Sequence, residues 1–179
     1  MEQKTLLSLA EFFAMPGDGV DYELVHGELV RRPPQPYIHD LVKNHIQELL
    51  ALYLSTNRLG RVFVETGSVL DEGSWRQPDV AYFRKERLAS QDPNKPIHGA
   101  ADICVEVVSP SNTHREMDER ARHFLATGAQ CVWIVYPATK EVQVRTKTET
   151  SWLGSEDELA HPDLLPGFSA RVQDLFEAQ

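Results

Sequence analysis

The stretch 101–122, ADICVEVVSPSNTHREMDERAR, places one carboxylate inside a run of residues that otherwise predicts a buried strand. Glu106 lies within the apolar run that ends at Val108, and the residues after it predict a charged helix. A lone charge is costly to remove from water, so proteins neutralise it, pair it or give it a metal ion. Glu106 is therefore the first candidate functional residue of the chain.

A second carboxylate, Asp79, opens another apolar strand in QPDVAYF, residues 77–83. The preceding Pro78 lacks a backbone N–H, which suits the start of a strand. If the strands of Asp79 and Glu106 are antiparallel neighbours, the start of one lies beside the end of the other and the two carboxylates converge. Such a pair either shares a proton or binds a cation, and oxygen ligands suit a hard divalent ion.

The residues after Glu106 predict an amphipathic helix over 112–127. Ser111 or Asn112 can cap its first turn, and Gly128 ends it. The apolar stripe that would pack against the sheet consists of Met117, Ala121, Phe124 and Leu125.

Arg120 lies at the edge of this stripe, so its guanidinium can reach the two strand carboxylates. The alternative for Arg120 is a pair with Glu116 at spacing i, i+4 on the helix surface. For the acids, the alternative is structural: Glu106 pairs with an arginine of this helix, and Asp79 caps a turn. Pattern alone leaves these alternatives open.

The remaining periodicity predicts strands that alternate with helices, which favours an α/β fold in which helices flank a mixed sheet. The predicted elements are a helix over 6–14, a hairpin over 22–32 that turns at His26 and Gly27, a helix over 37–55, strands over 61–70 and 77–83 joined by the turn 71–75, a surface loop over 84–99, strands over 101–108, 130–136 and 141–148, and a tail whose short helix docks Leu175 and Phe176.

Composition indicates one globular domain, because 179 residues with 41% apolar content can bury one sizeable core. No stretch approaches the roughly 20 apolar residues of a membrane span, and the first residues do not resemble a secretory signal, so we expect a cytoplasmic protein. Cys104 and Cys131 lie in apolar runs and are expected to be buried thiols. The domain divides into a helix and hairpin (1–36), a core (37–136), and a hairpin and helix (137–179).

The net charge of −9 argues against a large phosphate-binding surface. Three arginines nevertheless gather on one predicted helix: Arg115, Arg120 and Arg122. The sequence is therefore still compatible with a local basic groove. The sequence has no nucleophile elbow, P-loop or dinucleotide motif.

The histidines give a weaker signal. His114 and His123 lack the spacing of a zinc-protease helix, and we expect both to be solvated. His39, in the first turn of a long helix, is either solvated or a contact to a site residue or a phosphate.

Several segments in order carry a resemblance to a known family: YELVHGELV, the helix start with His39, QPDVAYF, VEVVSPS, a charged helix that ends at a glycine, VWIVYP and LLPGF. In this order the chain resembles the Uma2 family of endonucleases, within the PD-(D/E)-x-K restriction-endonuclease-like superfamily. The resemblance covers nearly the whole chain. It implies a core of helix, three strands, helix and strand over residues 37–136, to which the N-terminal hairpin is added.

The resemblance also implies that Asp79 and Glu106 are the metal-binding acids. The lysine of the superfamily usually stands two residues after the acid, where this chain has Val108. In the Uma2 pattern that lysine lies on the next helix, at the position of Arg120. Arginine keeps the positive charge but stays protonated, so a role of this residue in activating water is in question.

We therefore expect a Mg²⁺- or Mn²⁺-dependent endonuclease acting on DNA, with Asp79, Glu106 and the Val107 carbonyl as ligands and Arg120 stabilising charge. His39 or Glu116 would support these residues from behind. Cleavage of both strands of a duplex would suit a homodimer. The alternatives are a catalytically degenerate member of the fold that binds nucleic acid or protein, and metal-free hydrolysis by two carboxylates, as in glycosidases.

Overall fold

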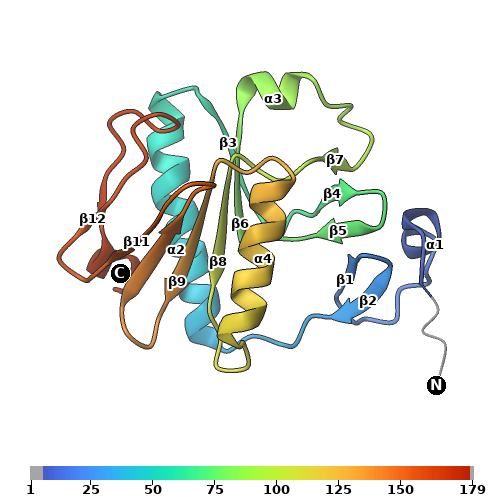
Figure 1. Ribbon diagram of the computed structural model, residues 1–179. Helices are drawn as coiled ribbons and strands as arrows, with labels where there is room; N and C mark the ends of the chain where they lie inside the picture. The colour runs from blue at the N-terminus through green and yellow to red at the C-terminus, as the bar shows by residue number, and fades with distance from the viewer. Residues whose placement is uncertain (1–5, 178–179) are drawn as a thin grey trace.

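The computed structural model describes residues 6–177, in which a six-stranded sheet lies between two helices (Figure 1). In spatial order the strands of this sheet are β11 (Thr150–Leu153), β10 (Glu141–Arg145), β9 (Cys131–Tyr136), β8 (Ile103–Val107), β6 (Val80–Arg84) and β3 (Gly60–Val64). Neighbouring strands are antiparallel except β8 and β9, which are parallel, so the sheet is mixed as predicted.

Helices α2 (Tyr37–Thr56) and α4 (His114–Ala126) cover opposite faces of this sheet. Successive side chains of each strand point to opposite faces, so the apolar residues of one strand pack against both helices. In β8, Ile103 and Val105 pack in the core on the α2 side, whereas Cys104 packs in the core under α4. Glu106 has the same strand parity as Cys104, so its side chain projects toward α4. Both free cysteines, Cys104 and Cys131, are buried as predicted.

A second, five-stranded sheet packs beside the first and holds the N-terminal hairpin. Its strands, in spatial order, are β2 (Glu28–Arg31), β1 (Tyr22–Val25), β5 (Ser74–Arg76), β4 (Ser68–Asp71) and β7 (Ile97–His98). The predicted turn between β1 and β2 is confirmed: His26 and Gly27 have φ values of 51° and 82°.

One long hairpin joins the two sheets, since β3 and β6 pair in the large sheet while β4 and β5 pair in the small one. The prediction of one continuous strand over 61–70 was therefore wrong. The chain breaks after β3, where Glu65 has a φ of 47°. A Cβ on Gly67 would lie 1.9 Å from the Trp75 ring, so the strand bends where only glycine fits. Asp79 lies opposite this bend, at the junction of the two sheets.

Two further predictions need correction. The expected loop 84–99 contains a short helix, α3 (Lys85–Ala89), and strand β7. Helix α4 starts later than expected and is capped by Thr113, whose side chain and that of Glu116 form a capping box. Asn112 does not cap it because its side-chain oxygen accepts hydrogen bonds from the backbone and hydroxyl of Ser109.

The other predicted elements are present. They include the short helix α1 (Leu9–Phe13), the β9–β10 hairpin, and the short helix of the tail, a 3₁₀ helix η1 (Val172–Phe176) that buries Leu175. The tail also forms two strands that were not predicted, β12 (Glu158–Leu159) and β13 (Ala170–Arg171). The predicted core order of helix, three strands, helix and strand is α2, β3, β6, β8, α4 and β9. Among the described residues, no helix is long and apolar enough to cross a membrane.

Candidate active site

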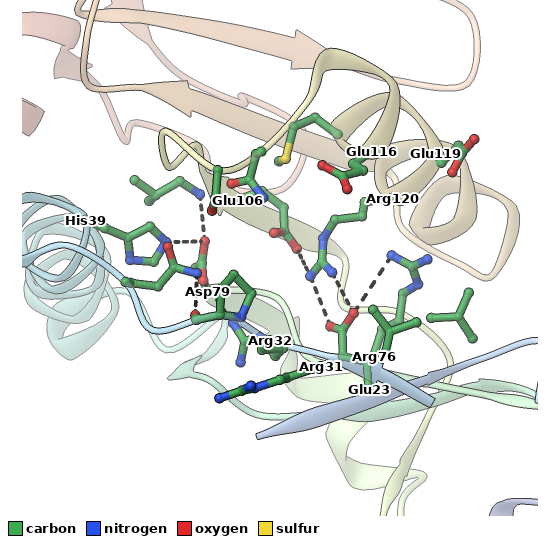
Figure 2. Close-up of a pocket in the computed structure, with 18 of the residues that line it drawn as sticks. Glu23, Arg31, Arg32, His39, Arg76, Asp79, Glu106, Glu116, Glu119 and Arg120 are labelled. Atoms are coloured by element: carbon green, nitrogen blue, oxygen red, sulfur yellow. Dashed lines mark hydrogen bonds and ion pairs between the residues drawn. The ribbon is translucent and has the colours of Figure 1, made fainter. Parts of the chain in front are cut away.

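A cleft of about 540 Å³ opens where the small sheet meets the large sheet and α4. Its lining includes Asp79 before β6, Glu106 on β8, Arg120 on α4, Glu23 on β1 and His39 on α2. Figure 2 shows two neighbouring groups in the cleft: His39 points toward Asp79, and Arg120 points toward Glu106 and Glu23. The cleft therefore combines acids and cations that the sequence keeps far apart.

Asp79 is only 2% exposed and accepts three contacts. Its Oδ2 accepts a hydrogen bond of 2.7 Å from the Val107 N–H and lies 3.2 Å from Nε2 of His39, and its Oδ1 accepts from Arg32 at 3.2 Å. The Val107 contact follows from the antiparallel pairing of β6 with β8, as predicted. Burial favours the neutral acid, but His39 and the Val107 N–H outweigh it and lower the pKa of Asp79. Asp79 is thus an ionised acceptor, and it caps no turn.

Glu106 is 5% exposed and is held by one donor, since Nη2 of Arg120 donates to its Oε1 at 2.8 Å. Burial raises the pKa of Glu106 to about 7; the charge of Arg120 opposes this shift and that of Asp79 adds to it. The two converging acids therefore titrate far apart. The structural alternative holds for Glu106, which does pair with an arginine of the next helix.

Arg120 connects three elements. Its Nη1 donates to Oε2 of Glu23 at 2.6 Å, and its Nη2 donates to Oε1 of Glu23 at 3.0 Å and to the Gln77 carbonyl at 3.3 Å. Burial alone would lower the pKa of Arg120, but Glu106 and Glu23 raise it well above its ordinary value. The alternative, a surface pair of Arg120 with Glu116, is not seen among the described residues: the Glu116 carboxylate accepts from the Thr113 N–H instead.

Glu23 is a site residue that the sequence reasoning missed. It is 1% exposed, accepts from the Gln77 N–H at 2.9 Å and lies 4.0 Å from Nη1 of Arg76. Burial would raise the pKa of Glu23, but Arg120 and Arg76 lower it overall. In the sequence, Glu23 is a carboxylate beside apolar strand residues, as Glu106 is. It was missed because polar and apolar residues alternate along its hairpin, which indicated that Glu23 lies on a solvated face.

Two histidines differ from the expectation of solvated side chains. His39 is 2% exposed and contacts Asp79, so its role as a supporting contact agrees with the geometry. His123 lies 2.9 Å from Asp71, with a side chain only 9% exposed. His26, Asp71 and His123 form a group whose potential ligand atoms all lie within 4.8 Å of one another. This group is a candidate metal site at the edge of the cleft. His114 is exposed as predicted.

The helix cations are distributed differently from the expected groove. Arg115 pairs with Glu119 on the exposed face of α4, and Arg122 pairs with Asp118, so Arg120 is the cation that α4 contributes to the cleft. The other arginines of the described lining come from β2, β5 and the segment after β2: Arg31, Arg32 and Arg76. Most arginines of the cleft therefore come from the small sheet and the segment after β2, and they stand among acids such as Glu23 and Glu106.

Comparison with known proteins identifies the family and the fold of the chain. Residues 9–173 match the Uma2 family, described as "Putative restriction endonuclease". The crystal structure of "a putative nuclease" from Anabaena variabilis ATCC 29413 superposes with a TM-score of 0.84 at 21% identity, covering 95% of this chain and 97% of that one. A cryo-EM structure of a DrdV–DNA complex gives a TM-score of 0.42 at 13% identity, over 79% of this chain and 14% of the other. No curated protein sequence matches the chain. The chain belongs to the Uma2 family and has a restriction-endonuclease-like fold.

Proposed function

We propose that this protein is a Mg²⁺- or Mn²⁺-dependent endonuclease that hydrolyses phosphodiester bonds of DNA, with Asp79 and Glu106 as its metal-binding acids. The observation that carries the proposal is the convergence of these two buried carboxylates, from two paired strands, in a cleft that also contains Arg120. Membership of a family of this description supports it.

The residues present fit a hard divalent cation. Asp79 and Glu106 offer carboxylate oxygens, and the Val107 carbonyl would complete the protein ligands. Among the described side chains and backbone groups, no donor bonds Oε2 of Glu106, so this oxygen is free for a cation. A divalent ion bound there would polarise a phosphoryl oxygen and lower the pKa of bound water.

The protein's own groups would prepare the site for a phosphodiester. His39 and the Val107 N–H fix the orientation of the Asp79 carboxylate. Arg120 stays protonated and would stabilise the negative charge that develops on phosphorus oxygens, without accepting a proton itself. The cleft arginines, including Arg32 and Arg76, would attract the DNA backbone despite the acidic net charge. Glu116 also lines the cleft, but its carboxylate caps the first turn of α4. It would therefore act on the site only by fixing the start of the helix that carries Arg120.

Nicking of supercoiled plasmid in Mn²⁺, Mg²⁺ or EDTA tests the proposal. We expect metal-dependent nicking by the wild type and a loss of about 100-fold or more in Glu106→Gln. Glu86→Gln, an exposed glutamate on α3, is the matched control and should nick at the wild-type rate. Nicking that persists in EDTA would favour metal-free hydrolysis by the two carboxylates. Equal nicking by wild type and Glu106→Gln would refute the assignment of Glu106.

The second candidate is a degenerate member of the fold that binds a nucleic acid or a protein. The observation that favours it is the ion pairing of Arg120 with two buried carboxylates, Glu23 and Glu106, which gives Glu106 a partner from the protein itself. Arg120→Lys restores the residue type expected from the family pattern and decides between the two. Nicking by the wild type supports the nuclease, whereas nicking that appears only in Arg120→Lys supports the degenerate member.

A further inference from the structure

A group of two histidines and one aspartate lies where two tight turns meet α4. His26 lies in the β1–β2 turn, Asp71 ends β4, and His123 lies in the last turn of α4. Oδ2 of Asp71 lies 2.9 Å from Nε2 of His123 and 3.9 Å from Nδ1 of His26. The two imidazole rings stack with centroids 4.9 Å apart. Three potential ligands from distant parts of the chain thus surround one point.

Backbone contacts hold the two turns in this arrangement. The Gly73 N–H donates to Oδ1 of Asp71 at 2.9 Å, which leaves Oδ2 directed toward the histidines. The Gly27 N–H donates to the Gly73 carbonyl at 2.8 Å, and the His26 N–H donates to Oγ of Ser74 at 3.0 Å. Contacts of this kind orient metal ligands in known sites. The ligand positions are therefore fixed by the turns themselves.

The surroundings suit binding from solvent. The side chains of His26 and Asp71 are 73% and 37% exposed, whereas that of His123 is 9% exposed. Imidazole binds a metal through a neutral ring nitrogen, and Nε2 of His123 is the atom that faces Asp71.

We propose that His26, Asp71 and His123 bind one transition-metal cation of the Zn²⁺ class, with water in the fourth position. Imidazole nitrogen with a single carboxylate suits Zn²⁺ and its neighbours, whereas Mg²⁺ prefers a set of oxygens. This site differs in ligands from the pair Asp79 and Glu106, and the inference does not rest on nuclease activity.

The position of the site gives the cation a structural effect. His26 follows Glu23 by three residues at the end of β1, and His123 follows Arg120 by three residues on α4. A cation at His26 and His123 would connect the same two elements that the Glu23–Arg120 ion pair connects. It would hold the N-terminal hairpin against α4 and close one side of the cleft.

Calorimetric titration of tag-free protein with Zn²⁺ tests the inference, with Co²⁺ absorption as a second readout of ligand geometry. We expect a saturable equivalent in the wild type that is at least ten-fold weaker in His26→Asn, separate from any Zn²⁺ bound by the cleft acids. Asparagine tolerates the positive φ of this turn position, so the fold should survive the change. Asp71→Asn keeps the acceptor for the Gly73 N–H and should weaken binding similarly.

Two controls separate this site from other ligands. His98→Asn removes an exposed histidine elsewhere and should bind Zn²⁺ as the wild type does. Glu106→Gln removes a ligand from the cleft acids and should keep the equivalent that His26→Asn weakens. Zn²⁺ should also raise the thermal midpoint of the wild type and leave that of His26→Asn unchanged. The inference is overturned by a wild type without saturable binding, or by equal binding in wild type, His26→Asn and Asp71→Asn.

Discussion

Replacing Arg120 by methionine should destabilise the protein strongly at pH 8. Methionine keeps much of the side-chain length but removes the guanidinium that bonds two buried carboxylates, Glu23 and Glu106. Breaking a buried ion pair by removing one partner costs about 3–5 kcal/mol, because an uncompensated charge stays behind. For a chain of this size, that corresponds to a fall of roughly 6–20 °C in thermal midpoint.

The cost should fall unequally on the two acids. Glu23 keeps the Gln77 N–H at 2.9 Å and Arg76 at 4.0 Å. Glu106 loses the donor at 2.8 Å, and no other described group donates to it. Much of the destabilisation therefore belongs to Glu106, and the double variant Arg120→Met/Glu106→Gln should recover part of it by removing the stranded charge.

Urea unfolding at pH 8 measures these differences, with Arg115→Met as the matched control. Arg115 lies on the same helix, but its side chain is 87% exposed and paired only with Glu119, so its loss should leave the midpoint unchanged. A change below about 1 kcal/mol in Arg120→Met would refute the reasoning, given the cost expected for a buried pair. So would a double variant less stable than Arg120→Met alone.

Two further predictions concern pH and backbone. Folded Glu106, with a pKa of about 7, keeps its proton where the unfolded residue has lost it, so the native state binds more protons between about pH 4.3 and 7. Stability attributable to Glu106 therefore falls as pH rises through that window. In urea melts, the unfolding free energy of wild type minus that of Glu106→Gln should drop by about 3–4 kcal/mol across it. A difference that stays flat or rises would contradict this. Gly67→Ala should cost about 1–3 kcal/mol because its Cβ would meet the Trp75 ring at 1.9 Å. Gly17→Ala, with no atom within 4 Å, should leave the thermal midpoint unchanged, and equal effects of the two would argue against the bend.

The convergence of Asp79 and Glu106 was predictable because each signal is local. A proline marks the start of one strand, an acid interrupts an apolar run in the other, and antiparallel pairing brings them together. The core order and the edge position of Arg120 followed from periodicity for the same reason. What pattern could not decide was the partner of Arg120, since Glu116 and the two buried acids were all within reach.

The docking of the small sheet could not be predicted, and the missed residues depend on it. Glu23 lies 97 positions from Arg120 in sequence, and its hairpin alternates like a half-exposed ribbon. His123 finds its partner Asp71 at the start of a predicted polar turn, 52 positions away. Long-range contacts of this kind leave no periodic signal. The bend at Gly67 was missed for a related reason, because the Trp75 ring that requires glycine lies on the opposite strand.

The most direct test of the central claim is the initial rate of plasmid nicking as a function of Mn²⁺ concentration in wild type and Glu106→Gln. The account predicts saturable, Mn²⁺-dependent nicking by the wild type and a rate lower by about 100-fold or more in Glu106→Gln at every Mn²⁺ concentration. Thermal melts would establish that both proteins are folded. Nicking of equal rate in the two folded proteins, or no Mn²⁺-dependent nicking by the wild type, would contradict it.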